Sequence, residues 1–243
     1  MTLLLLAGTG EARRIAWALA DSGVPVVASL AGATRAPEPL PVPTRVGGFG
    51  GAAGFCAYLA EAGITAVIDA THPFASAISQ RTARICAELR LPYLYVNRPA
   101  WVPGPADRWT AIAREEDAAK LIPPGATVFL ATGRQTLERF AGLEGRRVIC
   151  RQIDPPTAPF PFEGGEFCIG RPPFSVAREV ALFTELGVEW LVVKNSGGSE
   201  SRSKLDAAAE LGLPVLMLKR PVPPEGAPQA STVAAVADWV RAL

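Results

Sequence analysis

The chain contains a single histidine, and its four cysteines are widely spaced along 243 residues. Cys56, Cys86, Cys150 and Cys168 form no Cys-x-x-Cys pair, so neither a zinc site nor a disulfide framework is predicted. A Ser-His-Asp or Cys-His hydrolase would have to be built around His72 alone, and the sequence has no nucleophile elbow. We therefore expect no metal site and four cysteines that serve as small, buried hydrophobic residues.

A surplus of charge of one sign and long apolar runs are also missing. The 24 basic residues nearly balance the 23 acidic ones, giving a net charge of +1, which argues against general binding of nucleic acid. No uninterrupted apolar stretch is long enough to cross a bilayer. No basic region precedes the short apolar run at residues 3–7, as a signal peptide would require. We expect a soluble, cytoplasmic protein with no nucleic-acid or membrane partner.

Strand-like apolar runs alternate with helical patterns along the whole chain. The predicted strands are 3–7, 24–30, 44–46, 66–69, 93–97, 109–113, 127–131, 147–152, 190–194 and 214–218. The predicted helices are 11–22, 52–62, 75–89, 115–121, 135–141, 175–185, 199–211 and 233–243. This alternation is typical of parallel, doubly wound sheets.

The proline-rich stretch 98–105 interrupts the alternation, because proline fits neither a helix interior nor a strand ladder. The sequence thus predicts two Rossmann-like α/β domains, 1–100 and 101–243, with the active-site cleft between them. The proline-rich stretch 154–165 is either a low-complexity connection or a lid at the rim of the site.

The first predicted strand leads directly into a glycine turn and a helix. Gly8 and Gly10 allow a tight turn and a close approach of the backbone to a ligand, and the helix from about Glu11 presents free N–H groups there. This arrangement suits a phosphate. It is a shortened dinucleotide fingerprint, since Arg13 or Arg14 stands near the place of the third glycine, and a plain strand–helix connection is the alternative.

Five further polar clusters follow predicted strands. They are 29–35, 47–51, 69–75, 132–134 and 194–198. Ligands of open α/β sheets bind beyond the carboxyl ends of the strands, so these clusters predict a shared ligand crevice.

The segment after the second strand indicates the cofactor. A site for NAD usually has an acidic residue there, but Ser29 to Arg35 contains none and offers hydroxyl and guanidinium donors. Because arginine pairs with a phosphate and a carboxylate repels it, NADPH is favoured over NADH. The alternative is that Arg35 is only a solvated loop charge.

Three more residues have a functional and a structural interpretation. His72 either supplies a proton or holds a carboxylate, or its ring satisfies backbone groups in a turn fixed by Pro73. Asp69 is expected to cap the turn that follows its strand. Lys194 ends a strand of the second half, where it either acts on an acidic substrate, as Arg134 would, or caps the following turn.

One class of nicotinamide enzyme is disfavoured directly. A short-chain dehydrogenase uses a Tyr-x-x-x-Lys pair. The chain's tyrosines are Tyr58, Tyr93 and Tyr95, and none has a lysine four residues later.

In this order the motifs resemble the precorrin-6A reductase family over nearly the whole chain. In the first half they are Gly8-Thr9-x-Glu11-Ala12-Arg13, Ser29-Leu30-Ala31-Gly32, Gly47-Gly48-Phe49-Gly50-Gly51 and Asp69-Ala70-Thr71-His72-Pro73-Phe74-Ala75. They continue with Arg98-Pro99-x-Trp101, Thr132-Gly133-Arg134, Lys194-Asn195-Ser196-Gly197-Gly198 and Lys204-Leu205-Asp206-Ala207-Ala208. Ala33 stands where the family often has arginine, which passes the 2′-phosphate contact to Arg35, and Pro172-Pro173-Phe174 replaces the usual Gly-Pro-Phe.

The resemblance implies NADPH-dependent reduction of one double bond of precorrin-6A, a tetrapyrrole, to precorrin-6B in cobalamin biosynthesis. Neighbouring enzymes of that pathway are then candidate partners. The alternative is a non-catalytic NADP-binding sensor of two Rossmann-like domains, which would not need Arg134 or the 194–198 turn.

We predict three groups of site residues. Catalytic roles fall to Lys194 and His72. Cofactor contacts are expected from Gly8, Thr9, Gly10, Glu11, Ser29, Arg35, Gly48 and Thr71. Substrate contacts are expected from Arg134, Asn195, Ser196 and Gly197.

Overall fold

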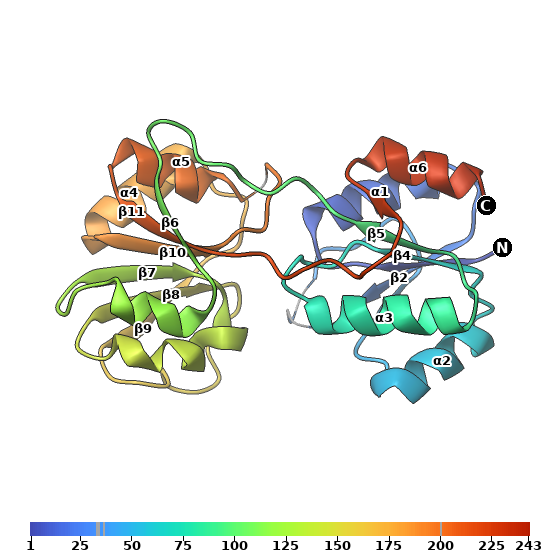
Figure 1. Cartoon of the computed structure of the whole chain (residues 1–243), viewed down its shortest axis with the longest axis horizontal. Coiled ribbons are helices and arrows are strands. Elements are labelled where there is room, and N and C mark those ends of the chain that lie inside the picture. The colour runs from blue at the N-terminus through green and yellow to red at the C-terminus, as the bar shows by residue number, and fades with distance from the viewer. Residues whose placement is uncertain (33–34, 36, 200) are drawn as a thin grey trace. The chain divides into compact units, whose positions relative to one another are not determined.

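The computed structural model describes residues 1–32, 35, 37–199 and 201–243 (Figure 1). The chain divides into two compact units. Unit 1 comprises Met1–Pro99 and Pro221–Leu243, and unit 2 comprises Ala100–Arg220.

Unit 1 is built on a parallel sheet with the strand order β12-β5-β4-β1-β2-β3. Its strands are β1 (Leu3–Leu6), β2 (Val26–Leu30), β3 (Thr44–Val46), β4 (Ala66–Asp69), β5 (Tyr93–Val96) and β12 (Gln229–Ala230). Its helices are α1 (Gly10–Ala20), α2 (Gly51–Glu61), α3 (Ser76–Glu88) and α6 (Val233–Arg241).

Helices cover both faces of this sheet, which explains the continuous apolar sequence of β1. Leu3 and Leu5 pack in a cluster with residues of α1 and α6, whereas Leu4 and Leu6 pack with residues of α2 and α3. In Figure 1, α1 and α6 lie together on the side of the sheet opposite α3.

Unit 2 contains a second parallel sheet, with the strand order β6-β11-β10-β7-β8-β9. Its strands are β6 (Arg108–Ile112), β7 (Thr127–Ala131), β8 (Arg147–Gln152), β9 (Gly165–Ile169), β10 (Trp190–Lys194) and β11 (Pro214–Leu218). Its helical segments are the 3₁₀ helices η1 (Glu115–Lys120) and η2 (Arg134–Leu143) and the α-helices α4 (Val176–Leu186) and α5 (Ser203–Glu210).

The two sheets have the same topology, with β7 taking the place of β1, but they exchange their sixth strands. The strand β6 follows β5 in the chain and yet pairs with β11, while β12 follows β11 and pairs with β5. This exchange explains why the chain crosses twice between the units.

The predicted fold class, two Rossmann-like units with parallel sheets, is confirmed. All ten predicted strands form, and their ends differ from the prediction by at most two residues. The prediction missed β9 and β12 because β9 lies beside a proline-rich stretch and β12 has only two residues. Predicted helices 115–121 and 135–141 are 3₁₀ segments, and helix 199–211 begins only at Ser203.

The division of the chain differs from the predicted domains 1–100 and 101–243. Residues Pro221–Leu243 belong to unit 1, because β12 completes its sheet and Val236 and Val240 of α6 pack into its core. Within the described ranges, no helix is both long and apolar enough to cross a membrane.

Candidate functional site

The turn after β1 lies where the strand order of unit 1 reverses, because β1 has β2 on one side and β4 on the other. Such a switch point is the usual ligand position in open α/β sheets. The Thr9 hydroxyl caps α1 by accepting a bond from the Ala12 N–H (3.1 Å), and it donates to the Ala70 carbonyl (2.8 Å). This pair of bonds fixes the turns after β1 and β4 against each other.

Gly8 gives this turn an open side. Its φ of +117° lies in the region that favours glycine, and a Cβ added there would meet nothing within 4 Å. The N–H groups of the first turn of α1 have no partners within the helix. The turn and the helix end therefore have the geometry expected of a phosphate site.

The Glu11 carboxylate is engaged within the protein. It forms ion pairs with Arg14, at 2.8 Å, and with the buried Arg98. Two arginines thus neutralise the only acidic side chain in the first turn of α1, so that it does not repel an anion at the helix end.

Asp69 caps the turn after β4, as expected. One carboxylate oxygen accepts bonds from the Thr71 N–H (3.1 Å) and hydroxyl (2.7 Å), and the other accepts from the Tyr93 hydroxyl (2.9 Å). Burial raises the pKa of Tyr93 far above its usual range, and the adjacent Asp69 carboxylate adds to the effect. Tyr93 therefore remains a donor, and the Thr71 hydroxyl is engaged in positioning this turn.

His72 lies exposed in the same turn. Its Nδ1 atom accepts a bond from the Phe74 N–H at 3.2 Å, and its ring lies 5.8 Å from that of Phe74. The ring thus satisfies a backbone group of the turn, which is the structural role considered above. A catalytic role for His72 stays a prediction.

The carboxyl ends of β2 and β3 contain a residue that the sequence analysis did not select. Arg45 donates from Nη1 to the Ser29 hydroxyl (2.8 Å) and the Gly47 carbonyl (2.9 Å), and from Nη2 to the Gly48 carbonyl (3.1 Å). An arginine two residues before a glycine turn was the available signal. Arg35 is exposed, whereas Ala33 and Thr34 lie outside the described residues.

Unit 2 has its own switch point at β7, which lies between β8 and β10. Lys194, at the end of β10, donates from Nζ to the Thr132 carbonyl at 2.9 Å and so joins the turns after β10 and β7. Burial lowers the pKa of Lys194, and the buried Glu115 carboxylate partly opposes the shift. The Thr132 hydroxyl oxygen is buried without a hydrogen-bond partner in the described structure.

The turn after β10 is held by Trp101. The Asn195 side chain accepts from the Trp101 N–H (2.9 Å) and donates to its carbonyl (3.0 Å), and the indole N–H donates to the Gly198 carbonyl (2.7 Å). Asn195 is therefore a backbone clamp, and its predicted substrate contact stays a prediction. Ser196 is buried, its N–H donates to the Lys194 carbonyl (2.6 Å), and Gly197 has a φ of +67°.

A buried basic cluster lies in the same unit. Arg151 forms a bidentate ion pair with Glu179 (2.7 and 2.5 Å), and its guanidinium lies between the rings of Phe129 and Phe174. Burial lowers the pKa of Lys204 to about 8. Arg134, the remaining predicted substrate residue, lies exposed at the start of η2.

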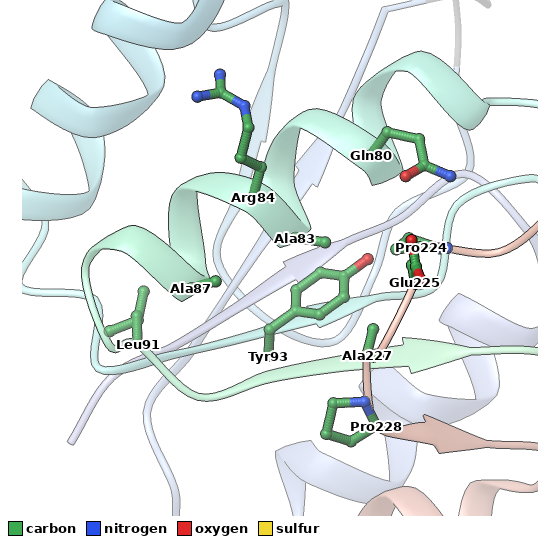
Figure 2. Close-up of a pocket in the computed structure, with 11 residues that line it drawn as sticks. Gln80, Ala83, Arg84, Ala87, Leu91, Tyr93, Pro224, Glu225, Ala227 and Pro228 are labelled. Carbon is green, nitrogen blue, oxygen red and sulfur yellow. The ribbon is translucent and has the colours of Figure 1, made fainter.

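A cavity of about 440 Å³ lies between α3 and residues 224–228, and Figure 2 shows Tyr93 beneath it, with Gln80 and Arg84 on α3. None of the predicted site residues lines this cavity. Among the described residues, no cluster of histidine, cysteine or acidic side chains could hold a metal ion.

The fold defines the class of protein: an α/β protein of two units, each built on a doubly wound parallel sheet with polar turns at the point where its strand order reverses. The family model described as "Precorrin-6x reductase CbiJ/CobK" matches residues 2–241. The chain belongs to this family.

Individual relatives cover nearly the whole chain. It is 43% identical to the precorrin-6A reductase of Rhodococcus erythropolis, over 99% of this chain and 98% of that protein. It is 41% identical to the precorrin-6A reductase of Rhodobacter capsulatus, over 91% of this chain and 89% of that protein. A solved structure titled "CobK precorrin-6A reductase" superposes with a TM-score of 0.95 at 39% identity, covering 100% of this chain and 96% of that one.

Proposed function

We propose that this chain is an NADPH-dependent precorrin-6A reductase of cobalamin (vitamin B12) biosynthesis. The observation that carries the proposal is its similarity to proteins of that name across 99% of its length. The reaction adds a hydride and a proton across one double bond of the macrocycle and gives precorrin-6B. When bound, NADPH supplies the hydride. We also propose that the protein works in the cytoplasm and that neighbouring enzymes of the pathway are its partners.

The described residues of unit 1 fit a phosphorylated dinucleotide. The positive-φ turn at Gly8 and the N-terminus of α1 suit the pyrophosphate, while the two arginines on Glu11 remove an opposing charge. At the end of β2, a buried Ser29 bonded to Arg45 stands where an NAD site has a carboxylate. Gly10, at the start of α1, and Gly48, after β3, would contact the cofactor through their backbone atoms. Thr9 and Thr71 contribute by holding the turns after β1 and β4.

The described residues of unit 2 fit a polycarboxylate substrate. Arg134 and Lys194 supply positive charge near the turns after β7 and β10, and Gly197 supplies a backbone N–H group in the latter turn. Ser196 belongs to the same turn, where its own N–H donates to the Lys194 carbonyl (2.6 Å). We assign to Lys194 the neutralisation or protonation of the macrocycle as it is reduced, because its ammonium is half-buried and already oriented by Thr132.

The decrease of NADPH absorbance with and without precorrin-6A tests the proposal. We expect oxidation of NADPH only when the tetrapyrrole is present, with precorrin-6B formed in equal amount. A protein that binds NADPH but never oxidises it in the presence of precorrin-6A would be a sensor and not a reductase.

Gly8→Ala is expected to lower NADPH affinity at least tenfold. The new methyl group would stand on the open side of the turn, where the pyrophosphate is proposed to lie. The positive φ also strains any other residue, at a cost of about 1–3 kcal/mol in unfolding free energy. Calorimetric titration and thermal unfolding separate the two effects.

Gly23→Ala is the matched control. Gly23 also has a positive φ (+73°) with nothing within 4 Å, but it follows α1 at the opposite end of that helix from Gly8. Its substitution is expected to lower stability and to leave NADPH affinity unchanged. Equal affinities for all three proteins would remove Gly8 from the cofactor site.

A further inference from the structure

We propose that Arg45 determines the preference of unit 1 for a phosphorylated ribose, by binding a monophosphate group at the carboxyl ends of β2 and β3. The inference rests on the proposed use of NADPH and assigns the specificity to a residue outside the sequence-predicted site. It also moves the phosphate contact from Arg35 to Arg45.

The position of Arg45 is fixed by strand pairing. Arg45 is the register partner of Ser29, on the neighbouring strand β3. Its guanidinium extends toward the glycine turn, where it reaches the carbonyls of Gly47 and Gly48. The group that discriminates between ribose forms is expected at this end of β2. The guanidinium therefore lies at the position where a 2′-phosphate would have to be recognised.

Two aromatic rings hold the guanidinium. Its central carbon lies 4.0 Å from the centroid of the Phe49 ring and 5.0 Å from that of Tyr58. Phe49 in turn packs edge-on against the buried Phe55 of α2 at 4.8 Å. Arg45 is therefore ordered before any ligand arrives, which reduces the entropy that binding would cost.

The hydrogen bonds of Arg45 leave donors for a ligand. A guanidinium has five N–H groups, and three are bonded to Ser29, Gly47 and Gly48. In the described structure the Nε–H and one Nη2–H are without a protein acceptor. These donors are on nitrogens bonded to the same carbon, as bidentate recognition of a phosphate requires.

The charge of Arg45 is also available. All three of its acceptors are neutral oxygens, and none of the described carboxylates forms an ion pair with it. In the same unit, by contrast, Glu11 pairs with Arg98 and Glu38 pairs with Arg13. A cation bound only to neutral groups at the edge of a nucleotide site favours a dianionic ligand group.

The competing explanation is that Arg45 only supports the 47–51 turn. Both roles would make Arg45 important for nucleotide binding, but they differ in selectivity. A support for the turn would act equally on NADPH and NADH. A phosphate ligand would act only on the phosphorylated form.

Calorimetric titration with four nucleotides, without tetrapyrrole, separates these roles. The probes are NADPH, NADH, 2′,5′-ADP and 5′-AMP, and the proteins are wild type, Arg45→Met and Arg35→Met. We expect Arg45→Met to lower the affinities for NADPH and 2′,5′-ADP by about 10- to 100-fold, as the loss of a charged bidentate contact predicts. The affinities for NADH and 5′-AMP should change less than about threefold, because these nucleotides lack the phosphate group that the contact recognises.

Arg35→Met is the matched control, since it removes the same group from the exposed loop after β2. We expect it to leave the ratio of NADPH to NADH affinity unchanged. The inference would be overturned if Arg45→Met lost affinity for NADPH and NADH equally. It would also be overturned if only Arg35→Met lost affinity selectively for NADPH. If wild type binds neither nicotinamide nucleotide, the proposed cofactor itself is wrong, whereas equal wild-type affinities for both refute only the assignment to Arg45.

Discussion

Lys194→Met is expected to lower the turnover of precorrin-6A about tenfold or more, since electrostatic and general-acid groups usually contribute at least that. NADPH affinity should stay within about twofold of wild type, because the proposed cofactor residues lie in unit 1. Single-turnover oxidation of NADPH at saturating substrate, together with a separate NADPH titration, measures both quantities.

The pH profile distinguishes a proton donor from a fixed charge. Burial holds the pKa of Lys194 below that of an ordinary lysine, so an ammonium that donates its proton loses activity as pH rises through this lowered value. Lys194→Arg keeps the charge and, because arginine does not deprotonate, should remove this alkaline decline. If the arginine variant is as slow as Lys194→Met, proton donation is the role, and if its turnover is near normal, the charge alone suffices.

Lys219→Met is a suitable control, because Lys219 is an exposed lysine directly after β11 of the same sheet. Its turnover should equal that of wild type. A Lys194→Met protein that binds both ligands and turns over at the normal rate would show that Lys194 only holds the Thr132 turn.

Glu179→Ala is expected to lower the free energy of unfolding by about 3–5 kcal/mol, the usual cost of leaving one partner of a buried ion pair alone. Arg151 would then lie 9% exposed between two phenylalanine rings without its carboxylate. Chemical denaturation followed by circular dichroism measures the loss.

Two comparisons make this result specific. Glu166→Ala breaks the half-exposed pair with Arg147 and should cost less than about 1 kcal/mol. The double variant Arg151→Met, Glu179→Leu removes both charges and should recover much of the loss, because no uncompensated charge stays buried. Similar small losses for Glu179→Ala and Glu166→Ala would contradict this account of the pair.

The sequence predicted the strands well because each is a short apolar run in a sheet covered on both faces. It could not assign the last strand and helix to a unit. The pattern of α6 shows that it is a helix with an apolar face, but whether that face packs on α1 or on unit 2 depends on pairing between β12 and β5. Such pairing between distant segments leaves no local signal.

The candidate site was predictable where a local turn carries the chemistry. Gly8 and Lys194 stand at strand ends that the pattern identifies, and both lie at switch points in the structure. Long-range contacts were not predictable: nothing near Asn195 in the sequence indicates that its amide binds the backbone of Trp101, 94 residues earlier. Arg45 was missed because an arginine in a short strand is usually an exposed surface charge, and only the structure shows its hydrogen bond to Ser29.

The strand exchange has a consequence for how the protein is made. Asn97, next to β5, is bonded to Gln229 of β12 across 132 residues of sequence. At ordinary translation speeds the ribosome needs on the order of ten seconds to make that length of chain. During this interval the apolar sequence Tyr93–Val96 is the free edge of an incomplete sheet, and the core face of α1 still lacks α6. Unit 2 can close in the meantime, so the first unit to begin is the last to be finished, and a nascent chain has an unpaired β5 edge until β12 has been made.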